Sequence, residues 1–146
     1  MKSNRLIYLI LMLSVSLPVI NHCKEYQERS EPNKDSLSIN FESFNERYKD
    51  NQGLQIIDSR TLEEYKNGHI PGALILPVQD IESSKNTSKV LSTLKKDEEV
   101  YIYCSAGGPR SQRAAVILRV MGFKKAYFVT GGIAKWIAQG NPIEKD

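Results

Sequence analysis

Short apolar runs alternate along the chain with segments in which apolar residues recur at helical spacing. The runs that predict strands span residues 54–59, 73–78, 98–104 and 126–130. The segments that predict helices span residues 39–50, 61–67, 88–96, 111–122 and 131–140. Apolar strands that alternate with helices are typical of a buried parallel sheet. The pattern therefore predicts a single α/β domain with helices on both faces of a parallel β-sheet.

Several residues indicate where these helices begin and which face they bury. Asn40 is suited to cap a helix in which Phe41, Phe44 and Tyr48 share one face. Thr61 is suited to cap the short helix that follows the first strand. The helix expected at 111–122 turns one apolar face inward, formed by Ala114, Ala115, Ile117, Leu118 and Met121.

The chain begins with the layout of an export signal. Lys2 and Arg5 precede an apolar run over residues 6–17, which is shorter than the roughly 20 residues of a membrane span. We therefore expect residues 1–23 to direct the protein to the periplasm, either free or as a membrane-anchored lipoprotein. Cys23 is the candidate lipid-bearing residue, although His22 stands where such sites carry a small residue. A lipid on Cys23 is the one membrane contact that we expect.

A polar segment and a balanced charge follow the expected signal. Residues 24–36 lack apolar periodicity and predict a flexible tether, which leaves residues 37–146 as the folded domain. Loss of residues 1–23 lowers the 20 basic residues to 18 against 17 acidic ones, a net charge of +1. A charge so close to zero creates no strong field for nucleic acid. We therefore expect no nucleic-acid partner.

The cysteine count restricts the chemistry of the domain. The chain has two cysteines and two histidines, at spacings that form no metal site. If Cys23 is lipidated or removed with the signal, Cys104 is the remaining thiol, without a disulfide partner or a second thiol to resolve an intermediate. An unpaired thiol in an oxidising compartment is either buried or functional.

The segment around Cys104 carries the strongest chemical signal. Cys104 stands at the end of an expected strand and before an expected helix, a position where sites form in parallel sheets. The loop that follows supplies candidate anion-binding groups, namely Ser105, Ala106, Gly107, Gly108, Arg110 and Ser111. Glycines allow backbone amides to converge, the helix start adds free N–H groups, and Arg110 adds a planar cation. These groups favour a thiolate nucleophile over a structural cysteine followed by an ordinary turn.

Three segments of the chain resemble the rhodanese family. They are IIDSRTLEEYKNGHIPGA at residues 56–73, YCSAGGPRSQRAA at 103–115 and TGGIAKWIAQGNPI at 130–143. The resemblance covers residues 37–143 and implies a rhodanese-like α/β domain. It implies that Cys104 accepts a sulfane sulfur as a persulfide and passes it to an acceptor. It also implies that the reaction needs neither a metal nor an organic cofactor.

Three further polar residues lie within the matching segments. The resemblance implies that Asp58 and Arg60, at the end of the first strand, support the architecture near the loop. His69 is the last histidine of the chain and a candidate catalytic base. Its place between Gly68 and an Ile-Pro-Gly turn favours instead a histidine that stabilises the turn.

The spacing between Cys104 and Arg110 leaves other activities open. Arg110 comes six positions after Cys104, whereas sulfurtransferases of the family usually have five. The longer spacing resembles that of rhodanese-fold cysteine phosphatases and arsenate reductases. A phosphatase needs a general acid, but Pro109 precedes the arginine and the loop has no carboxylic acid. Sulfur transfer is therefore favoured over a phosphatase or arsenate reductase, with an inactive or slow binding module as the third hypothesis.

The sequence indicates the chemical class of the sulfur donor and of the sulfur acceptor, but not their identity. The expected donor is thiosulfate or a persulfide, and the expected acceptor is a thiol or cyanide, with a partner protein as a further candidate sulfur carrier. Ser105 stands where many family members have a cation directly after the cysteine. We therefore expect weak binding of thiosulfate.

Overall fold

A computed structural model of the protein describes residues 36–51, 53–83 and 87–146. The expected export signal, with Cys23, and all but the last residue of the expected tether lie outside these residues. Within the described ranges, no helix has both the length and the apolar character needed to cross a bilayer.

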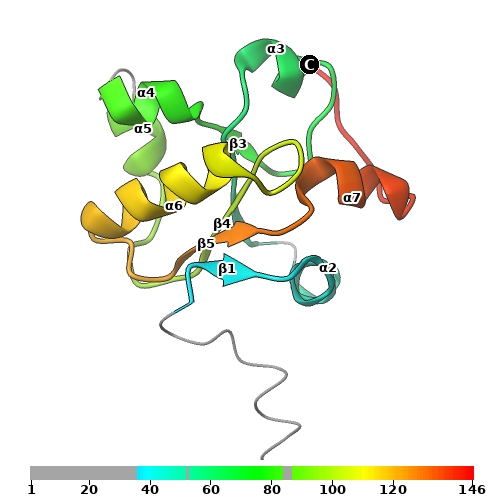
Figure 1. Ribbon diagram of the computed structural model, residues 1–146, viewed down its shortest axis with the longest axis horizontal. Helices are drawn as coiled ribbons and strands as arrows, with labels where there is room; N and C mark the ends of the chain where they lie inside the picture. The colour runs from blue at the N-terminus through cyan, green and yellow to red at the C-terminus, as the bar shows by residue number, and fades with distance from the viewer. Residues whose placement is uncertain (1–35, 52, 84–86) are drawn as a thin grey trace, which may run out of the picture. The chain divides into compact units, whose positions relative to one another are not determined.

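The described residues form one five-stranded sheet in which all paired strands are parallel. The strands are β1 (Ser38–Ile39), β2 (Gln55–Asp58), β3 (Leu74–Ile75), β4 (Val100–Tyr103) and β5 (Ala126–Val129). Their spatial order is β1-β5-β4-β2-β3, which places β4 at the centre of the sheet (Figure 1). In the register of β2 with β4, Asp58 lies opposite Tyr103. The residues that follow these two strands therefore lie at the same edge of the sheet.

Helices cover both faces of this sheet, as the sequence predicts. They are α2 (Phe41–Asp50), α3 (Leu62–Lys66), α4 (Val78–Ser83), α5 (Thr87–Leu91), α6 (Pro109–Val120) and α7 (Gly132–Ala138). Figure 1 shows α2 and α7 on one side of the sheet and α4, α5 and α6 on the other. The predicted α/β fold is confirmed.

Alternate residues of β2, β4 and β5 divide the core into two clusters. The cluster beneath α2 and α7 includes Ile56, Tyr101, Phe44 and Trp136. The cluster beneath α4 and α6 includes Ile57, Ile102, Val78 and Leu118. Because β2 and β4 are buried on both faces, they read as continuous apolar runs in the sequence.

Two capping predictions are confirmed by hydrogen bonds. The side chain of Asn40 accepts from the backbone N–H of Ser43 at 2.8 Å, at the start of α2. At the start of α3, the hydroxyl of Thr61 accepts from the backbone N–H of Glu64 at 3.2 Å. The Glu64 carboxylate accepts in return from the backbone N–H of Thr61 at 3.0 Å, which completes a capping box.

Other boundaries differ from the predictions. The apolar run at 73–78 splits into β3 and the first residue of α4, because Pro77 has no N–H to continue a strand. The helix expected from Ser111 begins two residues earlier, at Pro109, since proline is well suited to the first helical position. The helix expected at 88–96 is the shorter α5.

Candidate active site at Cys104

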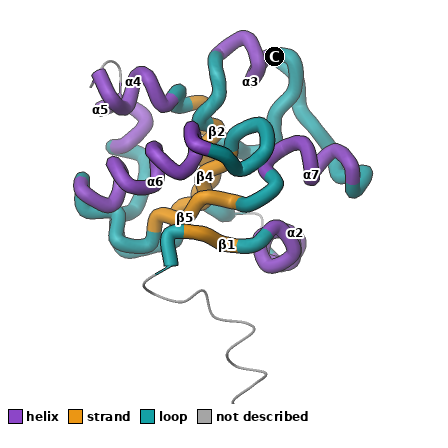
Figure 2. Tube along the Cα trace, viewed as in Figure 1, coloured by secondary structure: helices purple, strands orange, loops and turns teal. Residues whose placement is uncertain are grey.

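Cys104 follows directly on the central strand β4. Figure 2 shows the loop that leads from β4 to α6. Its side chain is buried, with 3% of the residue exposed. The backbone N–H of Gly108 donates to Cys104 Sγ at 3.2 Å, and the Ser111 hydroxyl oxygen lies 3.3 Å from the same sulfur. The loop therefore curls back so that its far end and the first turn of α6 surround the thiol.

These contacts determine the ionisation of Cys104. Burial acts to raise the pKa of the thiol, because a thiolate is poorly solvated in the protein interior. Hydrogen bonds outweigh burial and hold the pKa below its ordinary value, with donors in the Ser111 hydroxyl and the backbone amides of Ser111, Ala106 and Gly108. The arrangement favours the thiolate, which is the nucleophilic form of cysteine.

The loop also packs against the start of α7. The backbone N–H groups of Ile133 and Ala134 donate to the carbonyl oxygens of Cys104 and Ser105 at 3.0 and 2.9 Å. Gly132 allows this approach, since a Cβ atom there would lie 2.2 Å from the Cys104 carbonyl oxygen. The Gly-Gly pair of the third matching segment therefore allows the start of α7 to pack against the backbone of the loop.

The two glycines of the loop have different surroundings. At Gly107, with φ of +70°, a Cβ atom would lie 2.6 Å from the Val129 carbonyl oxygen. At Gly108, with φ of −93°, a Cβ atom would meet no heavy atom within 4 Å. The two residues provide a matched pair of alanine substitutions.

We expect Gly107→Ala to lower the free energy of unfolding by at least about 1–2 kcal/mol, from its left-handed backbone alone. The clash with Val129 adds to that loss. Gly108→Ala should cost less, up to about 1 kcal/mol, because Gly108 caps α6 but has an ordinary backbone and open space around it. Thermal unfolding of both variants measures the difference. Equal stability of the two variants would mean that the loop does not pack against β5 as described.

The Arg110 side chain, predicted to bind an anion, binds a carboxylate of the protein. Its Nη1 and Nη2 atoms donate to the two carboxylate oxygens of Glu64 at 2.6 and 3.1 Å. Nη2 also donates to the Ser105 hydroxyl oxygen at 2.8 Å. Arg110 and Ser105 therefore lie in contact, with Glu64 from α3 as a third partner.

Sequence reasoning missed Glu64 as part of this site. Hydrogen bonds from Arg110 lower the pKa of Glu64 to about 2; partial burial opposes that shift and bonds from Thr61 add to it. The signal present in the sequence was the pairing of Thr61 with Glu64 in a capping box, which identifies a helix start but no chemical role.

Asp58 and Arg60 form a buried ion pair beside the loop. Arg60 Nη2 donates to the Asp58 carboxylate at 2.6 Å and to the Gly68 carbonyl oxygen at 2.7 Å. The Tyr103 hydroxyl donates to the same carboxylate at 2.7 Å and accepts from the backbone N–H of Ile70 at 3.1 Å. The network joins the ends of β2 and β4 to the turn that follows α3.

His69 has partners on α3 and on the C-terminal segment. Its ring stacks on Tyr65 with centroids 3.7 Å apart, and its Nδ1 lies 3.1 Å from the Tyr65 carbonyl oxygen. Its backbone N–H and carbonyl pair with those of Glu144. Figure 1 accordingly shows the C-terminus beside α3. These contacts anchor the end of the chain at the turn.

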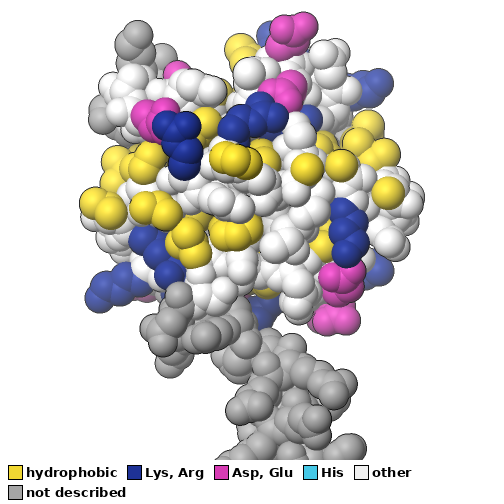
Figure 3. Space-filling model, in the orientation of Figure 1, with side chains coloured by type: hydrophobic (Ala, Val, Ile, Leu, Met, Phe, Trp, Pro, Cys, Tyr) yellow, Lys and Arg dark blue, Asp and Glu magenta, His cyan; other side chains and the backbone are white. Residues whose placement is uncertain are grey.

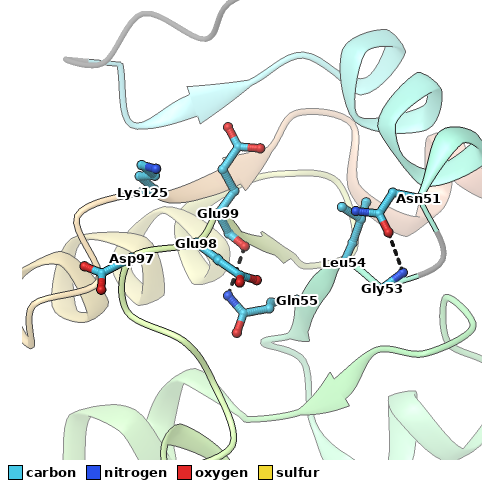
Figure 4. A pocket seen from close by; sticks show the side chains of 8 residues that line it. All are labelled: Asn51, Gly53, Leu54, Gln55, Asp97, Glu98, Glu99 and Lys125. Atoms are coloured by element: carbon cyan, nitrogen blue, oxygen red, sulfur yellow. Dashed lines mark hydrogen bonds between the residues drawn. The ribbon is translucent and has the colours of Figure 1, made fainter.

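A pocket at the opposite end of the strands from Cys104 is lined mainly by charged and amide side chains. Its lining includes Asp97, Glu98, Glu99, Gln55 and Lys125, as Figure 4 shows. The Gln55 amide donates to the Glu99 carbonyl oxygen at 3.2 Å, so this side chain joins the starts of β2 and β4. The pocket lining contains no cysteine, serine or histidine that could act as a nucleophile or base.

Two further observations concern metal ions and nucleic acid as ligands. Within the described ranges, no three His, Cys, Asp or Glu residues are grouped so that they could hold a metal ion. On the face shown in Figure 3, acidic and basic side chains lie interspersed. That face therefore presents no extended basic surface of the kind that binds nucleic acid.

The family model described as the Rhodanese-like domain matches residues 40–139. The chain therefore belongs to the rhodanese-like domain family, as its three motifs predict. Cys104 and its loop lie inside the matched region.

Relatives and solved structures agree with this assignment. The chain is 35% identical over 105 residues to a sulfurtransferase of Allochromatium vinosum, covering 72% of this chain and 92% of that protein. It is 34% identical over 110 residues to the candidate sulfur carrier protein YrkF of Bacillus subtilis. That match covers 75% of this chain and 56% of YrkF, so the chain spans little more than half of YrkF. The rhodanese-like domain of Alr3790 from Anabaena has a TM-score of 0.64 at 26% identity, covering 76% of this chain and 80% of that one.

Proposed function

We propose that the protein is a sulfurtransferase that carries sulfur as a persulfide on Cys104. The Cys104 thiolate attacks the outer sulfur of the donor, and the donor's S–S bond breaks. Thiosulfate would leave as sulfite and a persulfide donor as a thiolate, each with the bonding electron pair. An acceptor such as cyanide or a thiol then attacks the outer sulfur on Cys104, which restores the thiolate. Each step exchanges one bond at sulfur for another.

The observation that carries this proposal is the set of hydrogen bonds to Cys104 Sγ. Gly108 N–H and the Ser111 hydroxyl lie 3.2 and 3.3 Å from the sulfur. Such donors stabilise negative charge, first on the attacking thiolate and then on the outer sulfur of the persulfide. The family and its sulfurtransferase member in Allochromatium vinosum support the same reaction.

The six-position spacing from Cys104 to Arg110 favours a phosphatase or arsenate reductase as the second candidate. A phosphatase must protonate an alkoxide or phenoxide leaving group. Glu64 is the carboxylate in contact with the loop, and its pKa of about 2 keeps it ionised at neutral pH. It is therefore a poor general acid, whereas sulfite and thiolates leave without one.

Parallel assays of the two reactions test the proposal. We expect the protein to gain the mass of one sulfur when incubated with thiosulfate or cysteine persulfide, and to form thiocyanate when cyanide is added. We expect no turnover of an aryl phosphate above the rate in buffer. Turnover of the phosphate ester together with inertness toward both sulfur donors would favour the second candidate.

A further inference from the structure

Arg110, the cation beside the active-site loop, is already paired with a carboxylate. Arg110 uses both ends of its guanidinium on the two oxygens of Glu64, at 2.6 and 3.1 Å. A third bond from Arg110, at 2.8 Å, goes to Ser105, the residue directly after the nucleophile. An incoming anion can occupy both ends of this fork only by displacing the Glu64 carboxylate.

Glu64 is itself held in place by further bonds. The backbone N–H and the hydroxyl of Thr61 donate to Oε2 at 3.0 and 3.1 Å, and the Ser105 hydroxyl donates to Oε1 at 3.2 Å. The carboxylate is therefore bonded to the helix start on one side and to the active-site loop on the other. Its low pKa keeps the carboxylate negatively charged at neutral pH.

The charges of Arg110 and Glu64 therefore offset each other. The electrostatic attraction that an unpaired arginine would exert on a doubly charged anion is offset by a fixed carboxylate. The amides around Cys104 Sγ remain, and they can stabilise a single negative charge on sulfur. A thiosulfate ion brings a second charge that has no partner in this loop.

We propose that Glu64 is a specificity-determining residue that weakens the binding of dianionic sulfur donors, so that Cys104 prefers persulfide donors with a single charge on sulfur. The proposal rests on the proposed sulfur transfer by Cys104. It assigns a role in donor selection to a residue of α3, outside the loop that carries the nucleophile.

Alkylation of Cys104 by two reagents of similar size measures how strongly Glu64 disfavours an anionic reagent, without any sulfur transfer. Iodoacetamide is neutral, whereas iodoacetate carries a negative charge beyond its reacting carbon, as thiosulfate carries one beyond the sulfur that is transferred. Both reagents react with the same thiolate. The ratio of their rates is therefore independent of the fraction of thiol that is ionised. Mass spectrometry of the Cys104 peptide from the full chain reports the two products separately from those of Cys23.

Three variants change one charge at or near the Arg110–Glu64 pair. Glu64→Gln should lower the ratio of the iodoacetamide rate to the iodoacetate rate at least about fivefold, because Arg110 is then unpaired. Arg110→Gln should raise the ratio, because Glu64 is then unpaired. Glu63→Gln removes the same charge from an exposed neighbour on α3 and should leave the ratio within about twofold. Glutamine also serves in a capping box, so Glu64→Gln preserves the start of α3.

Donor kinetics supply the second measurement. Glu64→Gln should lower KM for thiosulfate at least about fivefold and leave KM for cysteine persulfide within about twofold. Circular dichroism verifies the fold of each variant, and the opposite change in Arg110→Gln carries the test if Glu64→Gln does not fold.

The outcomes separate this inference from the proposed function. Alkylation ratios that are equal in the native protein and all three variants, or that change equally in Glu63→Gln and Glu64→Gln, would overturn the role of Glu64 while leaving sulfur transfer standing. A native protein and variants that accept sulfur from neither donor would refute the proposed function. In that case the alkylation ratios would still decide whether Glu64 disfavours anions at Cys104.

Discussion

Cys104→Ser should leave the protein without detectable sulfur transfer. A serine hydroxyl does not ionise near neutral pH, and its oxygen cannot hold the transferred sulfur as a persulfide. The environment of Cys104 favours a sulfur anion through the Gly108 amide and the Ser111 hydroxyl, at 3.2 and 3.3 Å from Sγ. Thiocyanate formation and the mass gain of one sulfur measure the loss.

The second cysteine of the chain supplies the matched control. Cys23→Ser makes the same replacement and should keep the native rate of sulfur transfer. The rate of Cys104 alkylation by iodoacetamide should also reach half its maximum below the ordinary pKa of a thiol, because the hydrogen bonds lower that pKa. Native activity in Cys104→Ser, or a loss confined to Cys23→Ser, would show that the wrong cysteine had been assigned.

Asp58→Asn should destabilise the domain by about 3–5 kcal/mol, the usual effect of removing one member of a buried ion pair. Asp58 is fully buried, and Arg60 is 7% exposed. The substitution leaves the guanidinium without its counter-ion while keeping the size of the side chain. Urea unfolding followed by fluorescence of Trp136, the single tryptophan, measures the loss.

An exposed ion pair provides the comparison for Asp58. Lys95 and Glu98 lie 2.8 Å apart, but their side chains are 73% and 52% exposed. Glu98→Gln should therefore change stability little, since water already solvates both charges. Similar stability of the two variants would mean that water reaches the Asp58–Arg60 pair and that it contributes no more than a surface contact.

Strong hydrophobic patterns made most of the fold predictable. β2 and β4 are buried on both faces, so their continuous apolar runs stand out from the polar helices between them. β1 was missed because two residues, Ser38 and Ile39, are too few to show a period. α4 was missed because its first residue, Val78, continues the apolar run of β3 in the sequence.

The nucleophile and its loop were predictable because they are contiguous in the sequence. Cys104, the glycines and Arg110 fall within seven positions, where residue types alone indicate an anion-binding turn. The partner of Arg110 was not predictable in this way. Glu64 lies 46 positions earlier, and only the adjacency of β2 and β4 brings α3 to the loop. Pairings over such distances depend on topology and leave no local pattern.

The contact between the cysteine loop and α7 has a consequence for the reaction barrier. Ile133 and Ala134 fix the carbonyl groups of Cys104 and Ser105, and so fix the orientation of the peptide planes that follow. In the proposed sulfur transfer, negative charge would move from the attacking sulfur to the leaving group. Dipoles that are already oriented need not turn as this happens, so the reorganisation energy is small. The closing Gly-Gly segment would thus accelerate the reaction through preorganisation, without contact with donor or acceptor.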